Sequence, residues 1–155
     1  MEGTEHVIGI GKIIGNLHSL ELLLRVFLCE ANGEKLEFPA SSAGTVQETH
    51  LTNFMSLGDL IDAYNSTLTP PEKMFSVDRS VVNIRDAIAH GRLTSLSETF
   101  PLTLHKFGKP KAGTVTIELV EVISKMWLDE RLQLIRDQMD KIPRCTKARG
   151  YKFFP

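Results

Sequence analysis

The chain has 155 residues, of which 42% are hydrophobic and 24% are charged, as in ordinary soluble globular domains. Eighteen Lys and Arg residues face nineteen Asp and Glu residues, so the formal net charge is -1. This balance excludes a protein that binds nucleic acid over its whole surface, although it leaves room for local basic patches. The length predicts one domain with a proper core.

The N-terminus lacks the basic region of a signal peptide, and no apolar run is expected to reach the length of a membrane span. We therefore expect a cytoplasmic protein with no membrane partner. Cys29 and Cys145 are predicted to be free thiols, with a disulfide as the alternative. The scattered histidines and the two cysteines show no spacing of metal ligands, so neither a metal nor a cofactor is expected.

Apolar residues in alternating steps of three and four predict a long first helix that ends at Asn32 and Gly33. The stripe consists of Ile10, Ile13, Leu17, Leu20, Leu24, Phe27 and Ala31. The following residues, 33–53, have the composition of a loop.

A second helix is predicted over residues 57–68. Ser56 and Asp59 form a start that resembles a capping box. Pro70 and Pro71 terminate this helix and can begin a new turn that leads to the next one.

The third predicted helix runs over residues 77–89, with Val77, Val81, Ile84 and Ile88 as its buried stripe. Gly91 is expected to stop it, since the residue after a helix end often needs a left-handed conformation.

The period then changes to alternation, which predicts a β-hairpin with strands at 102–107 and 114–119 around a Gly/Pro-rich turn. The last helix is predicted over 121–142 and is expected to end at Pro143. Together these elements predict an all-α fold, a bundle of four to five helices, with the hairpin inserted at about 100–120 before the last helix.

We expect residues 1–142 to form the single domain and residues 143–155 to form a basic, aromatic tail. The tail carries Arg144, Lys147, Arg149, Tyr151, Lys152, Phe153 and Phe154 and no acidic residue. Such a tail can bind single-stranded nucleic acid by charge and stacking. We favour the simpler interpretation, in which it frays or docks on the bundle.

Arg85 and His90 lie five positions apart near the end of the third predicted helix, and Arg92 follows directly after Gly91. Arginine binds phosphate through a planar fork of donors, and histidine exchanges a proton near neutral pH. Cleavage of RNA without a metal needs a base for the 2′-hydroxyl and an acid for the leaving oxygen. The pattern therefore predicts chemistry on a phosphodiester.

Five residues on a regular helix turn the chain by about 500°, which leaves roughly 140° between the side chains of Arg85 and His90. The two converge only if the helix ends near Ala89 or if a second copy of the chain faces the first. A two-fold dimer would bring together two copies of each residue, with Arg85 stabilising charge on the phosphorane.

A structural role is the alternative for the same residues. Arg85 could pair with Asp78 or Asp86 on the surface, and His90 could cap the helix end. Two features favour a function: Asp86 is a polar residue in an otherwise apolar helix, and Gly91 with Arg92 gives a sharp exit beside the histidine.

Residues 83–92 resemble the signature of the HEPN superfamily, small α-helical domains of prokaryotic toxin–antitoxin, phage-defence and RNA-processing systems. That signature is an Arg, usually followed by Asn, Asp or His, then a short apolar spacer and a His. Arg85, Asp86 and His90 occupy these positions. The resemblance implies a homodimeric helical bundle with metal-independent endoribonuclease activity, in which these three residues are catalytic.

Three further residues, Arg92, His105 and Lys106, are expected to bind the phosphates of the RNA. The competing hypothesis is a non-catalytic helical interaction module, as in HEPN domains that partner a nucleotidyltransferase antitoxin or belong to larger complexes. The near-neutral charge of the chain favours this alternative, because a general RNA-cleaving enzyme often carries more positive surface.

Overall fold

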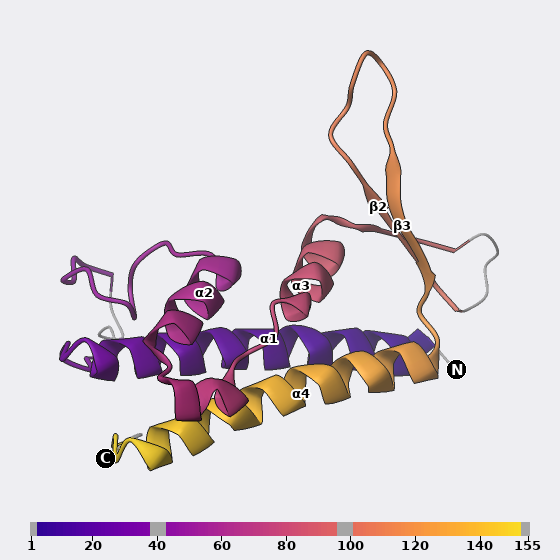
Figure 1. Cartoon of the computed structure of the whole chain (residues 1–155). Helices are drawn as coiled ribbons and strands as arrows, with labels where there is room; N and C mark the ends of the chain where they lie inside the picture. Colours follow the sequence, from indigo (N-terminus) through magenta and orange to yellow (C-terminus); the bar gives the residue numbers. More distant parts are fainter. Residues whose placement is uncertain (1–2, 38–42, 96–100, 153–155) are drawn as a thin grey trace. The chain divides into compact units, whose positions relative to one another are not determined.

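The computed structural model describes residues 3–37, 43–95 and 101–152. Figure 1 shows the elements along the chain. In order they are α1 (Gly3–Ala31), α2 (Leu57–Thr67), the 3-10 helix η1 (Pro70–Phe75), α3 (Ser80–His90), β1 (Arg92–Thr94), β2 (Thr103–Phe107), β3 (Ile117–Val122) and α4 (Lys125–Ala148).

The predicted all-α class is wrong, because a three-stranded antiparallel sheet accompanies the four α-helices of the described residues. Strands β2 and β3 form a hairpin where one was expected, and β1 adds a third strand in the order β1-β2-β3. With three residues, β1 is too short for alternation to reveal it in the sequence. It exists through its pairing with β2, in which Leu93 lies opposite Leu104.

The last helix also differs from its prediction at both ends. Residues 121 and 122 belong to β3, and α4 continues through Pro143 to Ala148. Pro143 removes one backbone donor, but the next turn remains attached because Cys145 and Thr146 are buried. The Thr146 hydroxyl also donates a hydrogen bond to the carbonyl of Ile142 at 2.9 Å. The predicted tail is therefore helical as far as residue 148, while Phe153 and Phe154 lie outside the described residues.

The chain divides into two compact units, and α1 and α4 each contribute one part to either unit. The first unit comprises Met1–Leu17 and Ser80–Ile135, so it contains α3 and the sheet. Its buried apolar side chains are Ile13, Leu17, Val81, Ile84, Ala87, Leu104, Ile123, Trp127, Leu128, Leu132 and Ile135. Leu104 is 1% exposed, so one face of β2 packs into this core.

The second unit comprises His18–Arg79 and Arg136–Pro155 and contains α2 and η1. Its core includes Leu20, Leu24, Phe27, Leu28, Leu57, Leu60, Ile61, Tyr64, Leu68, Val77 and Ile142. The predicted start of α2 is confirmed, because Ser56 and Asp59 form a reciprocal capping box. Arg25 of α1 holds the loop before α2 by donating hydrogen bonds to the carbonyls of His50, Asn53 and Met55 at 2.9–3.1 Å.

The expectation that no apolar run has the length of a membrane span is wrong for helix α1. By length and composition it is long and apolar enough to cross a membrane: a stretch of 18 of its residues has a mean hydropathy of 1.4, and 22% of that stretch is buried. The core helix of a soluble protein and a signal sequence pass the same test, so this is weak evidence for a membrane helix.

Candidate functional site

The three residues of the motif lie on the part of α3 that faces away from the core of the first unit. Val81, Ile84 and Ala87 are the buried positions of this helix. Arg85 and His90 are exposed, and Asp86 is half-buried. A ligand in solution can therefore reach all three side chains.

Helix α3 stays regular to its end, so one chain does not bring Arg85 and His90 together. The backbone N–H of Gly91 still donates to the carbonyl of Ala87 at 2.8 Å, which keeps His90 on the helical path. The separation of roughly 140° expected for a regular helix therefore applies. Of the two routes to convergence, an early end of the helix is excluded, and a second copy of the chain remains.

The helix ends at Gly91 as predicted, but the reason differs from the expected one. The glycines with positive φ among the described residues are Gly33, Gly113 and Gly150, so Gly91 is not left-handed. A Cβ at Gly91 would lie 2.1 Å from the carbonyl oxygen of Ala87 and 2.5 Å from Leu104. The backbone of the preceding turn of α3, together with the packing of β2 beside it, therefore requires glycine at this exit.

Within the motif, Arg85 donates a hydrogen bond to the carboxylate of Asp86 at 3.0 Å. This pairing agrees with the structural alternative for Arg85, and it also fits a function in which Asp86 orients the guanidinium. Their side chains are 48% and 35% exposed, so the ion pair itself adds little stability. The side chain of His90 makes no hydrogen bond or ion pair with any described residue, so the alternative in which it caps the helix is not observed.

The strand that follows α3 brings two of the predicted binding residues together. Arg92 lies directly opposite His105 in the pairing of β1 with β2. The Arg92 guanidinium lies 5.0 Å from the centroid of the Phe107 ring, and that ring stacks on His105 with an interplanar angle of 14°. Thr94 Oγ1 lies 3.2 Å from His105 Nδ1. We call Arg92, His105 and Phe107 the base cluster.

Lys106 is placed differently from the other predicted binding residues. Successive side chains of a strand point to opposite faces, so Lys106 is on the face opposite to His105. Its ammonium group pairs with the carboxylate of Glu118 at 3.4 Å. The neighbouring position on that face, Leu104, is buried. The prediction grouped His105 with Lys106, whereas the fold separates them.

A small pocket of about 220 Å³ lies beside α3, between it, β3 and the start of α4. Asn83, Ile84 and Ala87 line it from α3, and Glu121 and Arg131 lie across from them. None of Arg85, Asp86 and His90 lines this pocket. The motif is therefore an exposed surface of the single chain rather than the wall of a cavity.

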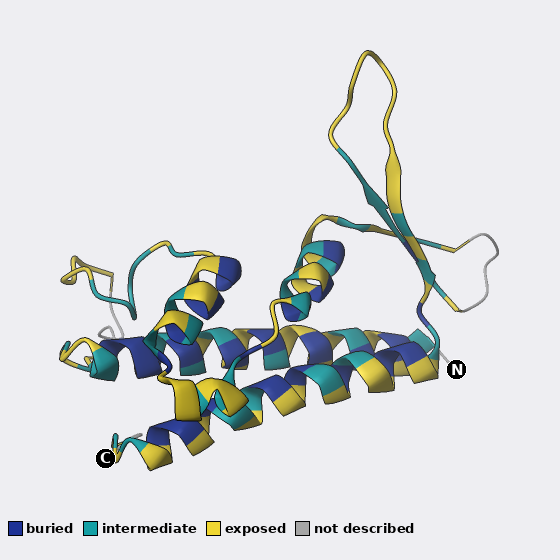
Figure 2. Ribbon diagram, viewed as in Figure 1, coloured by how far each residue is buried: buried dark blue, intermediate teal, exposed yellow. Residues whose placement is uncertain are grey.

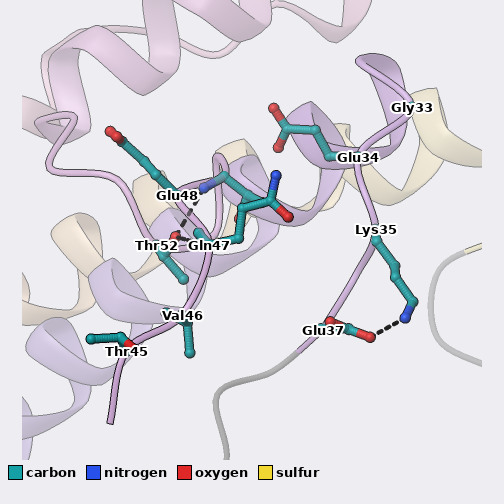
Figure 3. Close-up of a pocket in the computed structure, with 10 residues that line it drawn as sticks. Gly33, Glu34, Lys35, Glu37, Thr45, Val46, Gln47, Glu48 and Thr52 are labelled. Carbon is teal, nitrogen blue, oxygen red and sulfur yellow. Dashed lines mark hydrogen bonds and ion pairs between the residues drawn. The ribbon is translucent and has the colours of Figure 1, made fainter.

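A larger pocket of about 980 Å³ belongs to the second unit and is lined by loop residues on both sides of 38–42 (Figure 3). Its charged residues are mainly acidic: Glu34, Glu37 and Glu48, with Lys35 paired to Glu37. Burial raises the pKa of the Glu34 carboxyl, but the hydrogen bonds that it accepts, chiefly from the backbone and ring of His50, outweigh this, so the pKa is lowered and the group stays negative. An RNA phosphate would be repelled here.

Cysteine and metal chemistry find little support in the described residues. Cys29 and Cys145 are free and buried, which confirms the prediction of free thiols. Burial raises the pKa of both thiols, so neither is an activated nucleophile. No three His, Cys, Asp or Glu side chains in the described ranges lie close enough to hold a metal ion.

Two residues of this region could not be assigned a role from the sequence patterns used above. Phe107 lies two positions after His105, so the period-2 rule of a strand could have placed both on one face. Glu118 neutralises Lys106 across the hairpin. That pairing depends on a register shift between Lys106 and Phe107, which alternation alone does not reveal.

Comparison of the chain with protein-family models found no matching family. Comparisons with curated proteins and with solved structures found no match either.

Proposed function

We propose that this protein is a metal-independent endoribonuclease of HEPN type, whose cleft forms where the α3 helices of two copies of the chain meet. The observation that carries the proposal is that exposed Arg85 and His90 and half-buried Asp86 lie on a helix that remains regular to His90. The motif supplies the groups that the chemistry needs. The regular helix makes a second copy necessary to assemble them.

In the proposed cleft, one His90 takes the proton of the RNA 2′-hydroxyl, whose oxygen attacks the adjacent phosphorus. The His90 of the second copy gives a proton to the departing 5′-oxygen. The products are a 2′,3′-cyclic phosphate and a 5′-hydroxyl, and the proton balance between the two histidines is restored through water. Arg85 stabilises the charge of the phosphorane, and Asp86 holds Arg85 in position.

A non-catalytic interaction module is the second candidate, and one observation favours it. Strand β3 carries Ile117, Val120 and Val122, which are 52–56% exposed. Val120 lies opposite His105 and Val122 opposite Thr103, so both valines belong to the face of the sheet that carries the base cluster. Exposed apolar residues gathered on one face are typical of protein interfaces. An antitoxin or nucleotidyltransferase would be the partner in this case.

The test is cleavage of a labelled structured RNA in EDTA by the parent and by His90→Ala and Arg85→Ala proteins purified identically. We expect the parent to cleave and to leave cyclic phosphate ends. Loss of an acid–base group costs about 10²–10⁴-fold in rate, so the His90→Ala protein should be almost inactive. His18→Ala is the matched control, because His18 is exposed and lies outside the motif.

Equal cleavage by the parent and the His90→Ala protein would refute the assignment of the chemistry to His90. No cleavage by any protein, together with a dimer on sizing, would favour the interaction module and contradict the nuclease. A cytoplasmic location belongs to the proposal, because free buried thiols fit a reducing compartment. Recovery of the chain in the membrane fraction would contradict the cytoplasmic location and would indicate that α1 lies in the bilayer.

A further inference from the structure

We propose that the hairpin of β2 and β3 is an arm that binds the phosphate backbone of single-stranded RNA and guides the RNA to the end of α3. The inference rests on the proposed function for its choice of RNA as ligand. The hairpin arm is defined as residues 103–122. Figure 1 shows it extending away from α3, and Figure 2 shows that its outer part is exposed.

The charged residues in the outer part of the arm are mainly lysines. No acidic residue occurs between positions 101 and 117, whereas Lys106, Lys109 and Lys111 lie there. Lys109 and Lys111 are exposed at the tip, and neither forms an ion pair with a described residue. Lys106 is the exception, since Glu118 neutralises it. Two exposed cations that make no ion pair with a described residue can bind phosphates, even though the net charge of the chain is -1.

The base cluster supplies the second element of such a site. Arg92 is exposed and makes no ion pair with a described residue, and its guanidinium contacts the half-buried ring of Phe107. A cation beside a stacked pair of rings offers charge for a phosphate and a π-face for a base. These are the two interactions by which proteins bind single-stranded RNA without reading its sequence.

The positions of these groups connect the tip with the motif. Arg92 follows His90 by two residues, through Gly91. Lys109 follows His105 by four residues, so it lies at most about 14 Å beyond the base cluster at the rise of an extended chain. A strand of RNA lying along the arm would thus contact Lys109 and the base cluster in turn before it reaches His90.

Binding is measured by fluorescence anisotropy in EDTA, with a labelled oligouridine of about 12 nucleotides, a length that suits one binding module. All binding variants in this series carry the His90→Ala substitution as a common background, so that the RNA is not cleaved during the measurement. Adding Lys109→Ala and Lys111→Ala should weaken binding about tenfold at low salt. Removing two phosphate contacts should make the negative slope of log affinity against log salt shallower by about 1.4. Phe107→Ala should cost about tenfold through lost stacking.

Lys12→Ala is the matched control, because it removes one exposed lysine of α1 that lies outside the hairpin and makes no ion pair with a described residue. It should leave the salt slope unchanged. Circular dichroism confirms that each variant is folded. If the Lys109/Lys111 variant had the same salt slope as the His90→Ala protein from which it is made, the proposal would be overturned. The absence of RNA binding by the His90→Ala protein would overturn it as well.

The failure of this inference differs from the failure of the proposed function. If the unsubstituted protein cleaves RNA in EDTA but the Lys109/Lys111 variant binds RNA normally, the proposed nuclease activity stands and the proposed role of the hairpin arm is refuted. If the Lys109/Lys111 variant loses RNA binding but the unsubstituted protein does not cleave RNA, the hairpin arm stands as an RNA-binding element and the proposed catalysis is refuted.

Discussion

At the scale of single residues, Arg149 of the basic C-terminal segment has a structural role in the second unit. Its guanidinium donates hydrogen bonds to both carboxylate oxygens of Glu72 at 2.7 and 2.8 Å and to the carbonyl of Thr67 at 2.7 Å. It also lies 5.2 Å from the centroid of the Phe27 ring. Arg149 is therefore a structural cation that closes the second unit around η1.

This contact predicts a dependence of stability on pH. The hydrogen bonds from Arg149 and then from Thr69 lower the pKa of Glu72 to about 2. A carboxyl whose pKa is lowered by folding stabilises the protein at neutral pH, and this contribution is lost as the pH falls towards about 2. The Glu72→Gln protein should unfold at a lower urea concentration than the parent at pH 7, and the difference should shrink at pH 3.

Glu37→Gln is the control for this prediction, because Glu37 pairs with Lys35 on the surface, where ion pairs contribute little. It should match the parent at both pH values. A Glu72→Gln protein that also matched the parent at pH 7 would show that Arg149 does not hold the second unit in this way.

At the scale of elements, the junction of α3 and β1 sets the geometry of the candidate site. Gly91 joins the last residue of the helix to the first residue of the strand, so it fixes His90 and Arg92 relative to one another. Its requirement for glycine comes from the carbonyl of Ala87 and the side chain of Leu104. The same packing buries Leu104 and thereby decides which face of β2 carries His105.

Gly91→Ala should therefore destabilise the protein by about 1–3 kcal/mol, the usual cost of overpacking a close contact. Urea unfolding followed by circular dichroism measures this change. Gly11→Ala is the matched control, because a Cβ at this exposed helical position meets nothing within 4 Å. It should be neutral or stabilise the protein by up to about 1 kcal/mol. If the two substitutions had the same effect, the close packing at Gly91 would be refuted.

At the scale of the whole molecule, the sequence predicted what local periodicity determines. The long first helix, the capping box at Ser56 and Asp59, the hairpin and the end of α3 at Gly91 follow from apolar spacing, caps and glycine. The third strand and the extension of α4 beyond Pro143 depend on contacts with distant residues, so local patterns did not reveal them. For the same reason the sequence does not reveal that Arg92 and His105 are cross-strand partners.

The candidate site carries one requirement that belongs to the assembly rather than to the chain. Arg85 and His90 remain apart on a regular α3, so the proposed chemistry needs two copies, with one His90 as base and the other as acid. A two-fold axis near the end of α3 would satisfy this requirement. Two independent sites, one in each chain, would not.

The measurement that tests this claim most directly is the RNA cleavage rate in EDTA for mixtures of parent and His90→Ala protein at constant total concentration. Differently tagged chains confirm that subunits have exchanged. If both histidines are needed, an equal mixture retains about one quarter of the parent activity, the share of parent–parent dimers. A fall to about one half, linear in the parent fraction, would mean that each chain cleaves alone and would contradict the composite site.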